Sequence, residues 1–123
     1  MKTITLLITC VCLHGQTSQD LIVLREIGVK ESNMRRHAIG DGGRALGAYQ
    51  MHVEAWMDAN VQLMREGTST CDRASWRDAD VQDKMALAYL RVIRIRLSKR
   101  GYENPSTWML MRCWNYGVEG ATR

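Results

Sequence analysis

Two carboxylates, an amide and an aromatic ring lie within a stretch of twenty residues, from Glu31 to Gln50. Glu31 ends an apolar helical pattern, Asp41 follows in a glycine-dense turn, and Tyr49 and Gln50 precede a second helical pattern. Cleavage of a glycosidic bond requires one acid to protonate the leaving oxygen and a second group to act on the cation or on water. The same residues also fit a surface glutamate and a capping aspartate around an ordinary hairpin, and residue types alone leave both interpretations open.

A helix from Asp20 to Glu31 is expected to position the first acid, with Asp20 as its N-cap. Residues at three- and four-residue steps share one helix face. The residues on the expected face are Leu21, Leu24, Ile27, Gly28 and Glu31. Partial burial at the end of this apolar stripe would raise the pKa of Glu31 and keep it protonated as an acid. Gly28 costs about 1 kcal/mol relative to alanine inside a helix, which suggests a close approach by another group.

The second acid is expected on a small β-hairpin. Residues 33–39 are polar and basic, which is typical of a loop, and Gly40 to Gly43 form a turn sequence that carries Asp41. We therefore predict that the hairpin holds Asp41 over a cleft. His37, Asp41 and His52 match the spacing of no known metal site, so no metal and no cofactor are expected.

Three more helices are expected after the hairpin. The first is ended by Gly67, and its expected apolar face consists of Val53, Trp56, Met57, Val61 and Met64. We expect Trp56 to be a core residue and Asp58 to be structural.

The longest helix is predicted from Asp80 to Lys99, and its two adjacent apolar lines, one of which ends at Ile95, indicate a central buried element. Its arginines, Arg91 and Arg94, are expected on a solvated face. The last helix is predicted to begin at Asn104-Pro105, with Asn104 as its cap.

Several motifs, by their order and spacing, resemble the core of the invertebrate-type (destabilase-like) lysozymes and of their phage and bacterial relatives. These motifs are Glu31-Ser32, Ala38-Ile39-Gly40-Asp41, Gly47-Ala48-Tyr49-Gln50-Met51 and Trp56-Met57-Asp58-Ala59. Near the C-terminus, Trp114-Asn115-Tyr116-Gly117 resembles the asparagine-glycine element of that family, and also an element of lytic transglycosylases.

The resemblance implies a small, mainly α (α+β) lysozyme-like domain, with helices around a central buried helix and a minor β-hairpin. Its substrate would be the β-1,4 bonds of peptidoglycan glycan strands. Glu31 would be the general acid, and Asp41 would be the nucleophile or cation stabiliser of a retaining enzyme, or would position water in an inverting one. A separation of about 5–5.5 Å between the carboxyls implies retention, and about 6.5–9.5 Å implies inversion. Tyr49, Gln50 and Asn115 would orient the sugars, and Tyr116 would stack on a sugar ring or pack against the protein.

Two alternatives remain open. A lytic transglycosylase would use Glu31 alone, first as acid and then as base, and would leave an anhydro-sugar end. A non-catalytic, lysozyme-like wall-binding protein would keep the scaffold without turnover.

The composition fits a single globular domain. The chain has 123 residues, of which 46% are hydrophobic and 24% are charged. The net charge of +4 favours anionic partners. The sequence contains no basic cluster with interleaved aromatic residues of the kind that indicates nucleic-acid binding. Charge alone does not choose the partner, but the resemblance to lysozymes implies the bacterial wall, bound by a monomeric protein.

Residues 1–17 resemble a secretory signal peptide, because Lys2 precedes an apolar run from Ile4 to Leu13 that is too short to span a bilayer. If residues 1–17 are a signal peptide, residues 18–123 would be a secreted or extracellular catalytic domain (periplasmic in a bacterium) without a membrane anchor. The alternative is that residues 1–17 form a genuine first strand or helix of the domain. Cys10 and Cys12 would leave with the signal peptide, while Cys71 and Cys113 would remain as a disulfide or as two free thiols.

Overall fold

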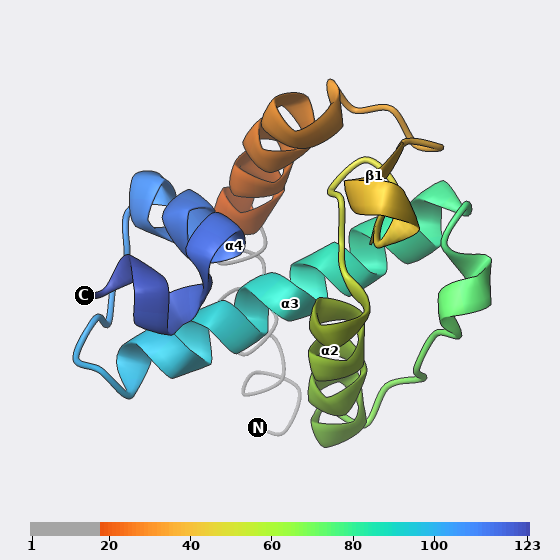
Figure 1. Ribbon diagram of the computed structural model, residues 1–123. Coiled ribbons are helices and arrows are strands. Elements are labelled where there is room, and N and C mark those ends of the chain that lie inside the picture. Colours follow the sequence, from red (N-terminus) through yellow and green to blue (C-terminus); the bar gives the residue numbers. More distant parts are fainter. Residues whose placement is uncertain (1–17) are drawn as a thin grey trace.

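The computed structural model describes residues 18–123 (Figure 1). The expected signal peptide, with Cys10 and Cys12, lies outside the described residues. Residues 18–32 form a helix, named here the first helix. It is followed by β1 (Ile39–Gly40), the 3-10 turn η1 (Asp41–Gly43), β2 (Ala45–Leu46), α2 (Val53–Arg65), the 3-10 turn η2 (Arg73–Ser75), α3 (Ala79–Ser98) and α4 (Thr107–Ala121). The described chain is thus mainly helical with one small antiparallel hairpin, which confirms the predicted fold class.

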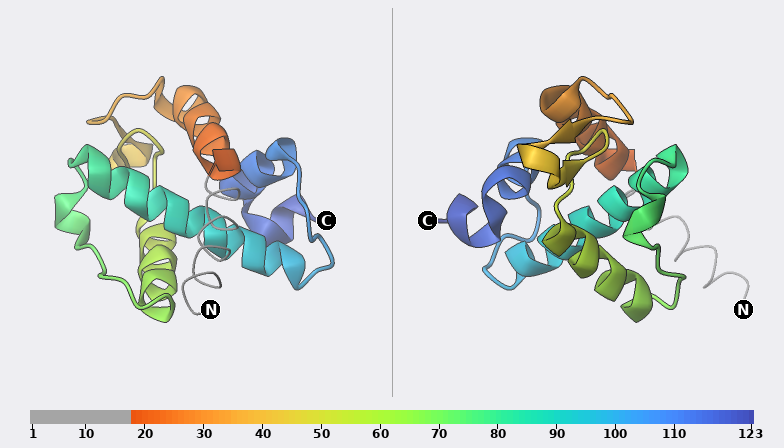
Figure 2. Two further views of the ribbon diagram at one scale, coloured as in Figure 1. Left: turned by 180° about the vertical axis from the view of Figure 1, so that it is seen from behind. Right: turned by 45° about the vertical axis from the view of Figure 1, so that its right-hand side comes forward.

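Helix α3 is the centre of the fold, as predicted. It runs through the middle of the molecule, with the first helix and α2 on opposite sides of it (Figures 1 and 2). Its side chains with at most 1% exposure are Met85, Ala86, Ala88, Leu90, Ile93 and Leu97. The helix begins after Asp78, whose Oδ1 accepts hydrogen bonds from the first free backbone amides. Ile95 was expected in the apolar line but is exposed.

The first helix buries a different set of residues from the one predicted. Val23, Leu24 and Ile27 are in the core, whereas Leu21 is 51% exposed. The helix already includes residue 18, so Asp20 is an interior residue and the prediction of an N-cap was wrong. Asp20 is 3% exposed, and its Oδ1 pairs with Arg94 Nη2 of α3 at 2.7 Å. A buried carboxylate is tolerated because this guanidinium compensates for its lost hydration.

Helix α2 buries a different face from the one predicted. Of the expected apolar residues only Trp56 is buried, while Met57 and Met64 are more than 60% exposed. The buried residues of α2 are Trp56, Ala59, Gln62 and Leu63. The prediction failed because the buried face contains a small residue, Ala59, and an amide, Gln62, whereas the prediction relied on the spacing of large apolar side chains. Asp58 is structural, as expected, and pairs with Arg96 of α3 at 2.9 Å.

Helix α4 begins two residues later than the predicted cap and starting proline indicated. Ser106, rather than Asn104, is its N-cap, and its Oγ accepts from the backbone amide of Met109 at 3.1 Å. Gly117 interrupts the helix with φ 73° and ψ 163°, a conformation that side chains disfavour. The last turn therefore changes direction.

Cys71 and Cys113 are both free thiols, so the disulfide alternative was wrong and the free-thiol alternative holds. Cys113 is buried in the core, and burial raises the pKa of its thiol. Within residues 18–123, no helix is both long and apolar enough to cross a membrane.

Candidate active site

A polar groove lies between the hairpin, the end of the first helix and α4. One hollow of about 390 Å³ is lined by Glu31, Gly40, Asp41, Ala45, Gln50, His52, Trp114 and Asn115. An adjoining hollow of about 270 Å³ shares four of these residues and extends towards Glu54 and Tyr89. The structure thus brings together four of the predicted site residues, which are Glu31, Asp41, Gln50 and Asn115.

Glu31 lies in the last turn of the first helix and is half-buried. Burial raises its pKa above the ordinary value, and the nearby Asp41 carboxylate acts in the same direction. The charges of Lys30 and His52 act in the opposite direction, and burial is the largest of these effects. Glu31 therefore keeps its proton to a higher pH than an ordinary glutamate, as a general acid must.

Asn115 extends from α4 and contacts this acid directly. In the amide orientation that satisfies both neighbours, its nitrogen donates to Glu31 Oε1 at 2.9 Å and its oxygen accepts from Lys30 Nζ at 2.9 Å. The predicted position of Asn115 in the cleft is therefore confirmed, although its observed partners are side chains of the first helix.

Asp41 lies on the turn of the hairpin, as predicted. The strands pair in the register Ile39 with Leu46 and Gly40 with Ala45, and four residues connect them. Asp41 Oδ2 lies 2.9 Å from His52 Nε2, and the Asp41 side chain is 61% exposed. The histidine thus holds the second carboxylate at the rim of the groove.

Gln50 contributes an amide to the groove wall next to Gly40. Its Nε2 donates to the carbonyls of Gly47 at 3.0 Å and Ala38 at 3.4 Å. A Cβ on Gly40 would lie 2.1 Å from Gln50 Oε1, so a glycine lets this side chain lie against the hairpin.

Neither of the other two predicted sugar contacts, Tyr49 and Tyr116, lines this groove. Tyr49 is 3% exposed, and its hydroxyl donates to Asp83 of α3 at 2.5 Å. Tyr116 is 63% exposed and stacks on the Arg112 guanidinium, 5.2 Å from its ring centroid, and it does not line the groove.

Two groove residues were missed as site residues by the sequence reasoning. His52 was considered as a metal ligand or as a solvated or capping residue. Its place at the start of a helix that follows the hairpin could have indicated that it pairs with Asp41. Trp114 lines both hollows, its Nε1 donates to the Tyr49 carbonyl at 3.1 Å, and its ring meets Tyr89 edge-on at 5.1 Å between centroids. In the sequence, only its position next to Asn115 could have indicated that Trp114 belongs to the site.

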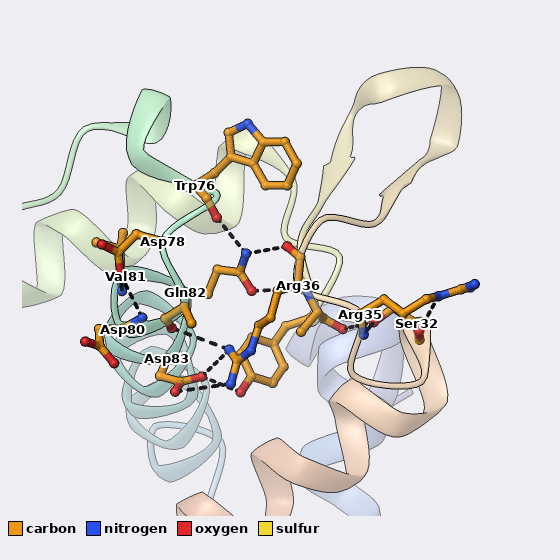
Figure 3. Close-up of polar contacts among 12 residues, drawn as sticks. Ser32, Arg35, Arg36, Trp76, Asp78, Asp80, Val81, Gln82 and Asp83 are labelled. Carbon is orange, nitrogen blue, oxygen red and sulfur yellow. Dashed lines mark hydrogen bonds and ion pairs between the residues drawn. The ribbon is translucent and has the colours of Figure 1, made fainter.

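Buried hydrogen bonds connect the groove to the core helix. Gln82 of α3 donates through Nε2 to the carbonyls of Arg36 and Trp76, both at 2.6 Å, and its Oε1 accepts from the Ala48 amide at 3.1 Å (Figure 3). Ser32 Oγ donates to the Ala48 carbonyl at 2.7 Å. The end of the first helix, the segment after the hairpin and α3 are thereby held as one unit.

The backbone is strained in the segment that builds the groove. In the described chain, the non-glycine residues with positive φ are Asn33, Met34, Asp41 and Gln50. Each such conformation costs about 1–3 kcal/mol for most residues and is maintained only where the surroundings impose it. Such strain clusters at functional sites, which supports the assignment of the groove as the candidate site.

No group of three or more histidine, cysteine, aspartate or glutamate side chains suited to a metal ion occurs within residues 18–123. Comparisons of the chain with protein-family models, with curated proteins and with solved structures find no match. The resemblance to lysozymes therefore remains a prediction based on the motifs.

Proposed function

We propose that this protein is a carboxyl-dependent enzyme that cleaves glycan strands. More particularly, we propose that it is a secreted lysozyme that hydrolyses the β-1,4 bonds of bacterial peptidoglycan. The observation that carries the proposal is Glu31: a half-buried acid with a raised pKa lines an open polar groove, with Asp41 on the same groove. The net charge of +4 would favour association with an anionic wall.

In the proposed reaction, Glu31 gives its proton to the glycosidic oxygen while the bond from that oxygen to the anomeric carbon breaks. Asp41 stabilises the positive charge on the sugar ring or forms a covalent bond to it, or it positions the attacking water in an inverting enzyme. Water completes the reaction, and its proton restores Glu31 directly or through solvent.

A lytic transglycosylase is the second candidate, because Asp41 is largely exposed and is already bonded to His52. Only Glu31 is then shielded from water. Glu31 would first protonate the leaving oxygen and would then accept a proton from the sugar's own hydroxyl, which closes an anhydro ring without water.

The test is the loss of turbidity of a peptidoglycan suspension with the wild type, Glu31→Gln and Asp41→Asn. Glu26→Gln is a matched control, because Glu26 lies on the same helix and is exposed. We expect Glu31→Gln to lose about 10²–10⁴-fold in rate, the contribution of a positioned general acid. Asp41→Asn should lose about 10–100-fold, and Glu26→Gln should match the wild type.

Product masses complete the test. Hydrolytic ends support the lysozyme, whereas anhydro ends, lighter by one water, together with a fully active Asp41→Asn indicate the transglycosylase. Full activity of Glu31→Gln would exclude both mechanisms. Wall binding without any turnover of the wild type would indicate a non-catalytic wall-binding protein.

A further inference from the structure

The side chains of Lys30, Asn115 and Glu31 form a continuous chain of hydrogen bonds at the groove. The two contacts of Asn115, to Lys30 Nζ and to Glu31 Oε1, are both 2.9 Å long. The first helix supplies the ammonium and the acid, and α4 supplies the amide between them. Lys30 is itself exposed, so its place in this chain is not explained by core packing.

The chemistry of the ammonium group decides the direction of the chain. A lysine ammonium has three donors and no acceptor, so only the amide oxygen of Asn115 can face it. The amide nitrogen, which can only donate, must then face Glu31 Oε1. An oxygen that accepts a hydrogen bond at this position cannot also direct a proton there, and the acidic proton is left to Oε2.

We infer that Lys30 and Asn115 are positioning residues that place the catalytic proton of Glu31 on Oε2. This inference rests on the proposed function for its catalytic meaning. It gives Asn115 a role other than contact with a sugar. It also adds Lys30, the residue before Glu31 in the sequence, to the candidate active site.

The inference makes a specific prediction for a variant that lacks the ammonium group of Lys30. With Lys30 replaced by an apolar residue, the amide of Asn115 is free to rotate by 180°, so that its oxygen can accept a hydrogen bond from a protonated Oε1. Protonated Glu31 would then hold its proton towards α4 for part of the time, where it cannot reach a glycosidic oxygen. The rate of the chemical step should fall, while the affinity for the substrate should change little.

The charge of Lys30 adds a second consequence. The charged groups that act on Glu31 are Lys30 on its own helix, Asp41 on the hairpin and His52 before α2, while α4 faces it with the neutral Asn115. Lys30 lowers the pKa of Glu31, so its removal should raise that pKa. The alkaline limb of the profile of kcat/KM against pH should then move to higher pH, because this limb reports the loss of the acid's proton in the free enzyme.

The experiment compares Lys30→Met with Lys30→Arg and with Lys99→Met. Arginine retains the charge and donates without accepting, and Lys99 is an exposed lysine at the end of α3, away from the groove. On soluble glycan-strand fragments we expect Lys30→Met to lower kcat about tenfold with KM within about twofold, and to shift the alkaline limb upward. Lys30→Arg should restore the limb and most of kcat, and Lys99→Met should equal the wild type.

A second measurement does not depend on turnover. Carbon-13 NMR titration of the Glu31 carboxyl in the wild type, Lys30→Met and Asn115→Leu reports its pKa directly. The inference requires a higher pKa in both variants, since each loses a group that favours the carboxylate. An unchanged pKa in Lys30→Met would overturn it, and so would an increase in KM with unchanged kcat, which is the behaviour of a sugar-binding residue. If the wild type cleaves no glycan, the proposed function fails, and the titration still decides whether this chain of contacts acts on Glu31.

Discussion

At the scale of single residues, burial of Glu31 has opposite effects on the proposed function and on the stability of the folded protein. Because burial raises the pKa of Glu31 in the folded protein, the folded state binds more protons than the unfolded state between the two pKa values. The free energy of unfolding therefore falls as the pH rises through this interval. The proposed general acid thus destabilises the fold at neutral pH.

Glu31→Gln should therefore raise the melting temperature at pH 7, although it should lower the proposed activity by about 10²–10⁴-fold. The neutral amide avoids the cost of a buried charge, and its oxygen can still accept from Asn115. The measurement is thermal unfolding followed by circular dichroism between pH 3 and pH 8. The gain over the wild type should disappear towards pH 3, where Glu31 is protonated in both states, and Glu26→Gln should show no gain at any pH.

The sequence predicted four of the residues that line the candidate groove, and it failed where the local direction of the backbone decided which side chain enters the groove. Glu31, Asp41, Gln50 and Asn115 line the groove as expected. Tyr49 does not, because it lies in a turn, where neither strand nor helix periodicity fixes the direction of a side chain, and its ring is buried against the core. Lys30 could not be recognised, since its role depends on an α4 residue far along the chain.

At the scale of elements, one buried amide holds the loops around the groove. Gln82 is 3% exposed and makes three hydrogen bonds to backbone atoms outside its own helix. A Cβ on Gly47, where φ is +82°, would lie 2.8 Å from this amide, so the turn packs directly on it. Gln62 of α2 is also buried, at 8% exposure, but its Oε1 has no partner among the described residues.

The same substitution should therefore have different effects at these two glutamines. Gln82→Leu should destabilise the protein by about 2–4 kcal/mol, because it leaves a buried amide and two carbonyls unsatisfied. Gln62→Leu should cost only about 1 kcal/mol, because it gives up a single side-chain hydrogen bond, from Nε2 to Glu66 Oε2 at 2.9 Å, and removes an oxygen that is already unsatisfied. Urea unfolding measures both values. Equal losses would mean that the volume of the glutamine, and not its hydrogen bonds, supports the fold.

Predictability also differed among the elements. The central helix was predicted almost to the residue, because two adjacent apolar lines permit only a buried position. The hairpin followed from its turn glycines. The face of α2 was wrong, because exposed methionines such as Met57 and Met64 carry the same apolar signal as buried ones. Which face is buried depends on the fit to α3, and periodicity does not encode that fit.

At the scale of the whole molecule, arginines of α3 connect elements that are far apart in the sequence. Arg94 pairs with Asp20 of the first helix, and Arg91 forms two bonds to Glu66 after α2, at 2.6 and 2.7 Å. Arg94, whose side chain is 18% exposed, therefore departs from the predicted solvated face, whereas Arg91 stays at the surface. Alternation of charge in the sequence shows that arginines are present on a helix face, but the partners come from tertiary packing.

The pair of Glu66 with Arg91 predicts the response of the whole fold to acid. Hydrogen bonds from Arg91 lower the pKa of Glu66, so this carboxylate stabilises the folded state above the ordinary glutamate value of 4.5. That contribution is lost as the pH falls through the lowered pKa. Glu66→Gln should therefore lower the free energy of unfolding at pH 7 by about 1 kcal/mol, a usual value for a well-formed pair at the surface.

Glu66→Gln and Glu31→Gln thus make the same chemical change with opposite expected signs. At neutral pH the first should destabilise the protein and the second should stabilise it, because the two pKa values are displaced in opposite directions. Both differences from the wild type should shrink as the pH falls below the pKa values of the carboxyls, since all three proteins are then uncharged at these positions. Urea unfolding at several pH values tests the pair together. A destabilised Glu31→Gln at pH 7 would show that burial does not govern Glu31, and the groove would lose the property on which its proposed chemistry depends. A stabilised Glu66→Gln would instead contradict the stabilising role of the pair with Arg91.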